Sequence, residues 1–269
     1  ETHGYAGFFG IPMEYEGYGD DVSVEACPPI ADPQHRITER PTDDDAQADR
    51  DRRAGIREAA AEIVETLEAN AATAYGFVES AGSGYGLALA SRTLVPGRVH
   101  DWLDSADDAV PDDHEVCDPV VDHQHTYAGD LPVGLTTDEK VEYAETAFDL
   151  MGWETFGRLV VFTGHASETA NNPFDSSLDC GACAGNPGGP SARVLAAICN
   201  QDEVRAELTE RGFEIPEDTV FLAGQHNTTT DEIELYDGAV PESHAAELEQ
   251  LRTDLERARE AATAERAAS

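Results

Sequence analysis

Two stretches decide the fold: RLVVFTG at residues 158–164 and TVFLAG at residues 219–224. Each is a continuous apolar run rich in β-branched or aromatic residues, the pattern of a strand buried on both faces. Between them lie a glycine-rich loop, a helix opened by Pro190 and a short helix that ends at Gly212. Strand, loop, two helices and strand in this order predict a parallel sheet, with ligands bound at the carboxyl ends of its strands.

Helical patterns lie on either side of these elements. TTDE at residues 136–139 supplies an N-cap with acids in the first turn, and apolar residues then mark one helical face as far as Met151. A second pattern with helical spacing runs from Asp43 to about Ala74. We predict an α/β fold with a mostly parallel sheet and helical insertions, in four regions: residues 1–35, a glycine- and aromatic-rich strand and loop; residues 36–130, a helical region with an acidic surface insertion at 101–122; residues 131–240, the α/β core with its glycine-rich site loop; and residues 241–269, a C-terminal helix.

The charge balance of the chain is extreme. Its 269 residues carry 55 acidic side chains against 17 basic ones, of which one, Lys140, is lysine, and the formal net charge is −38. Such a surface repels a polyanion and has no basic stripe, so the sequence excludes a nucleic-acid partner. Abundant acid with almost no lysine is typical of a protein kept soluble in concentrated salt, where self-repulsion is screened. We expect a halophilic protein.

The chain has no stretch of about 18 uncharged apolar residues, so we predict no membrane-spanning segment, and no signal peptide opens it. It begins with Glu1 rather than methionine, and its last segment stops within a helical pattern. We therefore expect these residues to be a fragment that lacks part of its functional site.

Each buried strand delivers a histidine at its carboxyl end. His165 follows the first strand directly, and His226 comes two residues after the second. Neighbouring parallel strands would place both imidazoles at one edge of the sheet. Fifteen residues after His165 comes Cys180, within LDCGAC at residues 178–183, and glycines follow it. This loop makes His165 the stronger candidate, because a histidine by itself is more often structural.

Three interpretations of Cys180 and Cys183 compete. A disulfide is disfavoured because five cysteines in an apparently intracellular chain are typical of reduced thiols. A redox Cys-x-x-Cys usually opens a helix, whereas this one lies in a glycine loop. A zinc site fits better, since thiolate and neutral imidazole are ligands that zinc prefers. Zinc takes four ligands, of which His165 and Cys180 are two; Cys183, Asp179 and His226 are candidates to complement them.

Other motifs point less clearly to chemistry. His123 and His125 have a metal-binding spacing but lie in an acidic loop, which favours solvated side chains. GHAS at residues 164–167 is not the Gly-x-Ser-x-Gly turn of a serine hydrolase. The glycines of residues 82–86 lack the flanking strand and the Lys-Ser/Thr of a phosphate loop, and favour close helix packing.

The motifs around these residues resemble those of one family, the DabA family of inorganic carbon transporter subunits. The resemblance covers most of the chain, and its motifs are long and occur in family order. They are GYAGFFGIP (4–12), FVE (77–79), GHAS (164–167), NNP (171–173), LDCGAC (178–183), ARVLAA (192–197), IPEDT (215–219) and HNTTTD (226–231).

The resemblance implies a β-carbonic-anhydrase-like core with a zinc centre, in which His165 and Cys180 are zinc ligands. The family's other ligands belong to a Cys-x-Asp-x-Arg motif upstream of GYAGFFGIP, which this sequence does not contain. The family also implies a peripheral protein on the cytoplasmic side of the cell membrane, associated with a membrane-embedded, antiporter-like subunit of the DabB type.

The function that follows is zinc-dependent hydration of CO2 to bicarbonate within a system that accumulates inorganic carbon. With half of the metal shell missing, we expect these residues alone to be inactive, and we assign no catalytic residue. The alternative is a non-catalytic metal-binding module that docks on a membrane partner, and a zinc hydrolase with another substrate ranks third.

Overall fold

The structure, a computed structural model, describes residues 2–95, 98–99, 110–111, 113–169 and 174–268. Two compact units make up the chain. The larger unit combines Glu1–Arg40 with Asp118–Ser269, and the helical unit is Pro41–Cys117.

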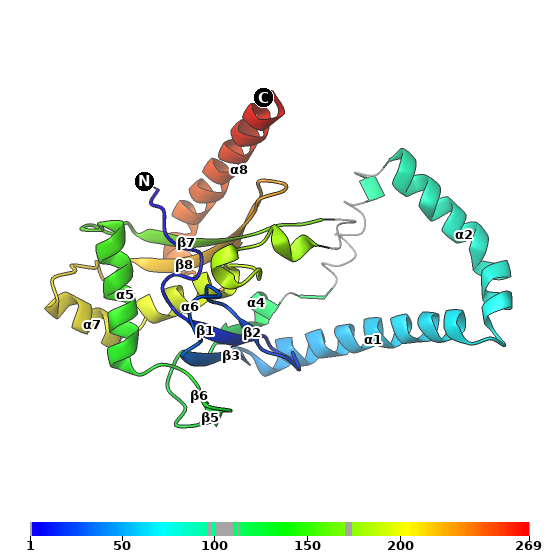
Figure 1. Cartoon of the computed structure of the whole chain (residues 1–269). Coiled ribbons are helices and arrows are strands. Elements are labelled where there is room, and N and C mark those ends of the chain that lie inside the picture. Colours follow the sequence, from blue (N-terminus) through cyan, green and yellow to red (C-terminus); the bar gives the residue numbers. More distant parts are fainter. Residues whose placement is uncertain (1, 96–97, 100–109, 112, 170–173, 269) are drawn as a thin grey trace. The chain divides into compact units, whose positions relative to one another are not determined.

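The two decisive stretches form neighbouring strands of the larger unit (Figure 1). β7 (Leu159–Ala166) and β8 (Val220–Asn227) pair in parallel, with Leu159 opposite Val220 and His165 opposite His226. The parallel pairing predicted for them is confirmed. β9 (Ile233–Tyr236) then pairs antiparallel with β8, which gives the order β7-β8-β9.

A second sheet has the order β2-β1-β3-β4. Its strands are β1 (Met13–Glu16), β2 (Val24–Glu25), β3 (His35–Pro41) and β4 (Cys117–Pro119). β1 is parallel to β3 and antiparallel to β2. β5 (Tyr127–Ala128) and β6 (Leu131–Pro132) form a small antiparallel hairpin.

The fold within the described residues is therefore mixed α/β, and the prediction of a mostly parallel sheet goes too far. Antiparallel pairs occur beside the parallel ones because short connections, such as the turn between β8 and β9, return the chain in the opposite direction. The α/β class itself is confirmed.

The helices of the larger unit follow the predicted punctuation. α5 (Thr137–Met151) has a capping box between Thr136 and Glu139 and ends at Gly152, whose φ is +68°. α6 (Gly189–Cys199) carries Pro190 in its first turn. The remaining α-helices and the 3-10 turns are α7 (Asp202–Glu210), α8 (Ala245–Ala268), η1 (Asp175–Ser177), η2 (Gly181–Cys183) and η3 (Glu242–His244).

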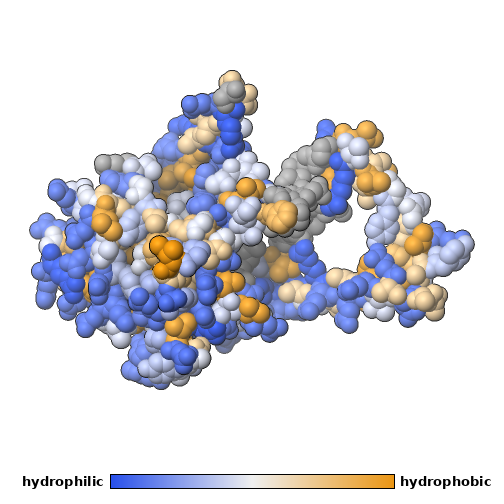
Figure 2. Space-filling model, viewed as in Figure 1, coloured by the Kyte–Doolittle hydropathy of each residue, from blue (hydrophilic) through white to orange (hydrophobic). Residues whose placement is uncertain are grey.

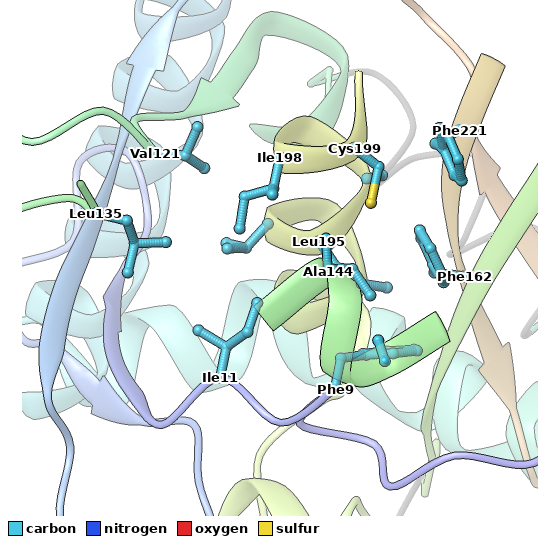
Figure 3. Close-up of a cluster of buried hydrophobic side chains, with 14 of the residues drawn as sticks. Phe9, Ile11, Val121, Leu135, Ala144, Phe162, Leu195, Ile198, Cys199 and Phe221 are labelled. Carbon is cyan, nitrogen blue, oxygen red and sulfur yellow. The ribbon is translucent and has the colours of Figure 1, made fainter. Parts of the chain in front are cut away.

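The core of the larger unit forms around α6 (Figure 3). Leu195 and Ile198 of α6 are fully buried. On the sheet side, the rings of Phe162 and Phe221 stack with centroids 5.8 Å apart, and Phe148 of α5 stacks on Phe221 at 6.0 Å. The apolar face predicted for residues 141–151 is thus the face that α5 buries.

Lys140, the one lysine, is also buried within the larger unit. Its ammonium group donates to Asp122 Oδ1 and to Gln201 Oε1, both at 2.6 Å. The lysine therefore ties α5 to the segment before β5 and to the residue that precedes α7.

The helical unit contains α1 (Asp44–Ala69), α2 (Ala74–Leu94) and the short α4 (Asp113–Val116). Its first helix is confirmed, but neither α1 nor α2 has a buried residue. Ile56 and Ile63, whose spacing predicted the helix, are 66% and 61% exposed. Apolar side chains therefore lie on the surface of both helices (Figure 2).

The glycine cluster at residues 82–86 lies within α2. Part of the predicted acidic insertion, residues 101–109 and 112, falls outside the described residues. Along the described ranges, no helix has both the length and the hydropathy needed to cross a membrane.

Candidate metal centre

His165 lies at the carboxyl end of β7, where the strand passes the first turn of α6. The N–H of Gly188 donates to the carbonyl oxygen of His165 at 2.9 Å. Gly164 permits this approach, because a Cβ there would overlap the backbone of Gly188 and lie 2.7 Å from the nitrogen of Gly189. The Nδ1 atom of His165 is buried and has no hydrogen-bond partner among the described residues.

Cys180 lies in the glycine loop, just before η2. Its carbonyl oxygen accepts hydrogen bonds from the N–H groups of Cys183 (2.9 Å) and Gly185 (3.0 Å). Ala184 and Gly185 both have positive φ, +58° and +82°, which reverses the chain after the turn. The side chain of Cys180 is buried. The loop thus fixes both the backbone and the environment of this thiol.

Both candidate ligands lie next to Gly7, a residue of the N-terminal segment. A Cβ placed on Gly7 would overlap the sulfur of Cys180 and lie 3.8 Å from Cδ2 of His165. The absence of a side chain at Gly7 leaves room for both groups. His165 and Cys180 are therefore both neighbours of Gly7, although the sheet and the loop position them separately.

The segments that carry these ligands are also joined directly. Oδ1 of Asp179 accepts hydrogen bonds from the backbone N–H of Ser167 at 2.6 Å and from its hydroxyl at 3.0 Å. Asp179 precedes Cys180, and Ser167 lies two residues beyond His165. Asp179 is thereby engaged with the end of β7.

Cys183 is buried close to Cys180, and its backbone N–H donates to the carbonyl oxygen of Cys180 at 2.9 Å. Burial, and then the neighbouring Cys180 thiol, raise the pKa of Cys183 well above its usual value. The thiolate form that binds metal is therefore disfavoured at Cys183 before any metal arrives. None of the five cysteines, all of which lie in the described part of the chain, forms a disulfide.

His226 faces the same edge of the sheet as His165 but has another neighbour. Its Nε2 lies 3.6 Å from Oδ1 of Asp231, and Asp231 also pairs with Arg266 of α8. His226 is thus part of an ionic cluster at the β8–β9 turn. His123 and His125, whose ring centroids are 4.7 Å apart, lie in the loop before β5, with His125 exposed.

Along the described ranges, no three or more His, Cys, Asp or Glu side chains are arranged to hold a metal ion. The donor set fits zinc at two positions, the imidazole of His165 and the sulfur of Cys180. The buried, unpartnered Nδ1 of His165 is a further sign of a polar site rather than an ordinary core position.

Sequence reasoning missed two features of the larger unit. Gly7 lies in the glycine- and aromatic-rich N-terminal segment, and only its approach to Cys180 reveals its role. A buried ion pair joins Arg193 of α6 to Glu39 of β3, and the hydroxyl of Tyr15 donates to Glu39 at 2.6 Å. In the sequence, the single arginine within the otherwise apolar stretch ARVLAA could have indicated a buried ion pair.

Comparisons with known proteins agree on one family. The model of the family described as "Probable inorganic carbon transporter subunit DabA" matches residues 1–269. Proteins with that same name are 77% identical over 269 residues in Haloarcula marismortui, 55% over 268 in Natronomonas pharaonis and 37% over 278 in Bacillus subtilis. Each match covers 99–100% of this chain but only 31–34% of the relative, so the chain spans about a third of their length. No solved structure matches the chain.

Proposed function

We propose a function from one premise: this chain belongs to the DabA family of inorganic carbon transporter subunits. The proposed role of the whole protein is the accumulation of inorganic carbon, with this part contributing to a site that hydrates CO2 to bicarbonate. The relatives carry the transporter name, and the chemistry is our extension of it.

The observation that supports this chemistry is that His165 and Cys180 both lie next to Gly7. A neutral imidazole and a thiolate are ligands that zinc prefers, and we assign both side chains to a zinc ion. When bound, zinc supplies Lewis-acid chemistry that lowers the pKa of water to about 7, which hydration of CO2 at neutral pH requires.

The residues of this chain have clear tasks in the proposal. His165 and Cys180 hold the metal, η2 and the positive-φ residues after it fix the backbone of Cys180, and the absence of a side chain at Gly7 leaves room for both ligands. Cys180 is buried, so the site shields its thiol from bulk water. The remaining ligands would come from outside these residues, in the upstream motif that the family implies.

For the assembly, we propose that the protein is peripheral on the cytoplasmic side of the membrane and binds an antiporter-like membrane subunit of the DabB type. The relatives are named as subunits, which supports a complex with a partner. We also propose that the acidic surface is an adaptation to high salt.

A second function is favoured by a different observation. Because the described residues contain no complete metal-ligand group, the alternative is a non-catalytic module, with a structural metal or none, that docks on the membrane partner. The two proposals differ in whether zinc and hydration activity depend on His165 and Cys180.

The test uses a full-length DabA protein carrying this sequence, purified in molar potassium chloride. We expect His165→Ala and Cys180→Ala each to lose bound zinc and CO2 hydration. His226→Ala is the matched control, because this histidine lies opposite His165 on the next strand but pairs with Asp231, and it should keep its zinc. Unchanged zinc content in both ligand variants would eliminate the enzyme and leave the docking module.

A further inference from the structure

We propose that Asp179 is a positioning residue, whose carboxylate holds Cys180 opposite His165 by binding the end of β7. The inference rests on the proposed zinc site and adds a residue that does not itself bind the metal. It concerns the geometry of the ligands and assigns no proton transfer to Asp179.

The contacts of Asp179 carry the inference. A single oxygen, Oδ1, accepts from both donors of Ser167, the backbone N–H at 2.6 Å and the hydroxyl at 3.0 Å. Hydrogen bonds to an ionised carboxylate are short and strong compared with neutral ones. Because Asp179 is covalently next to Cys180 and Ser167 follows the strand of His165, this pair of bonds links the two ligand segments.

Both ends of the link are anchored. On the strand side, the carbonyl oxygen of Ala166, next to Ser167, accepts from the N–H and the hydroxyl of Thr228 at 2.8 and 3.0 Å. On the loop side, the carbonyl of Cys180 accepts two backbone hydrogen bonds. Each segment is therefore held by its own hydrogen bonds, and the bonds between Asp179 and Ser167 fix one segment relative to the other. Breaking these bonds lets the loop move relative to β7.

The space at the sulfur leaves little tolerance for such movement. Gly7 approaches Cys180 so closely that a single Cβ would overlap the sulfur. A loop that shifts without its link to β7 would bring Cys180 against the backbone of the N-terminal segment or away from His165. Partners that orient metal ligands typically change metal affinity by about 10–100-fold when they are removed.

Three substitutions separate positioning from general stability. Asp179→Ala removes both hydrogen bonds, Asp179→Asn keeps an oxygen that accepts them, and Ser167→Ala removes only the hydroxyl bond. The matched control is Asp43→Ala, because Oδ1 of Asp43 accepts the backbone N–H of Ala46 at 2.7 Å as the N-cap of α1 in the other unit. It deletes the same kind of bond away from the ligand segments.

The experiment measures zinc dissociation constants and the visible spectrum of the cobalt-substituted protein, again in a full-length DabA protein carrying this sequence. We expect Asp179→Ala to raise the dissociation constant by about 10–100-fold and to weaken the thiolate-to-cobalt charge-transfer band. Asp179→Asn should keep most of the zinc affinity and most of the band intensity. Ser167→Ala should give values between those of Asp179→Ala and the parent protein, and Asp43→Ala should match the parent protein.

Parental affinity and spectrum in Asp179→Ala would overturn the inference, and so would an Asp179→Asn protein as impaired as Asp179→Ala. If Asp179→Ala does not fold, Ser167→Ala decides, and parental zinc affinity and spectrum there would overturn it. A parent protein that binds no zinc, or His165→Ala and Cys180→Ala proteins that keep it, would instead refute the proposed function.

Discussion

Replacing Gly7 with alanine tests the arrangement on which the metal centre depends. The added Cβ overlaps the sulfur of Cys180, and ordinary contact between heavy atoms requires about 3.5–4.0 Å, so the sulfur must retreat by roughly 1 Å or more. Cys180 is 1% exposed, which leaves its sulfur little room to retreat. Overpacking of this kind costs about 1–3 kcal/mol of unfolding free energy.

Gly4→Ala is the matched control, because a Cβ there meets nothing within 4 Å. Thermal unfolding in molar salt, followed by near-UV circular dichroism, should show a Tm roughly 2–10 °C lower for Gly7→Ala than for Gly4→Ala. In the zinc-free protein, the Cys180 thiol should also react faster with a thiol reagent in Gly7→Ala. Equal stability and equal reactivity of the two variants would refute the packing of Gly7 against the site.

Three further predictions concern stability. Lys140→Met removes the donor to Asp122 and Gln201 and should lower the free energy of unfolding by about 1–3 kcal/mol, measured by chemical denaturation; an unchanged value would contradict the tie. Burial lowers the pKa of His35 below 6.5 in the folded protein. The free energy of unfolding should therefore fall as the pH drops from about 6.5 toward the pKa of the folded state, because the unfolded chain takes up the proton first. His35→Gln should flatten that pH dependence, and an identical pH profile in the variant would contradict the role of His35. With a net charge of −38, the chain should lose structure on dialysis to low salt, whereas a full near-UV spectrum there would contradict halophilic adaptation.

The parts of the fold that could be predicted are those with local signals. The apolar runs of β7 and β8 and the capping box of α5 specify their elements almost independently of context. The parallel pairing followed from the two helices between the strands. β9 was missed because a four-residue strand after a tight turn gives a weak periodic signal.

The helical unit shows the limit of periodicity. Apolar residues at helical spacing predict that a helix forms, and α1 does form, but the spacing does not say what the apolar face contacts. Ile56 and Ile63 lie on the surface of a helix without a buried residue. Burial depends on tertiary neighbours, which no local pattern encodes.

The candidate site divides in the same way. Strand ends and a glycine loop indicated His165 and Cys180 as candidate ligands, but only the three-dimensional structure shows that both lie next to Gly7. Asp179 was considered as a complement to the metal shell, whereas the structure engages it with Ser167. The pairing of a carboxylate with one particular backbone N–H follows from loop geometry that composition and spacing do not determine.

The meeting of Gly7, Cys180 and His165 also has a consequence for how the chain folds. These residues come from the N-terminal segment, the loop and β7, so the site assembles only after contacts distant in sequence have formed. Such contacts form slowly because closing long loops costs entropy. A metal ion that requires the assembled site would bind the native state much more tightly than the unfolded chain. By mass action, a higher metal concentration would then raise the stability of the native state. We therefore expect the yield of folded protein during synthesis to rise with the supply of zinc.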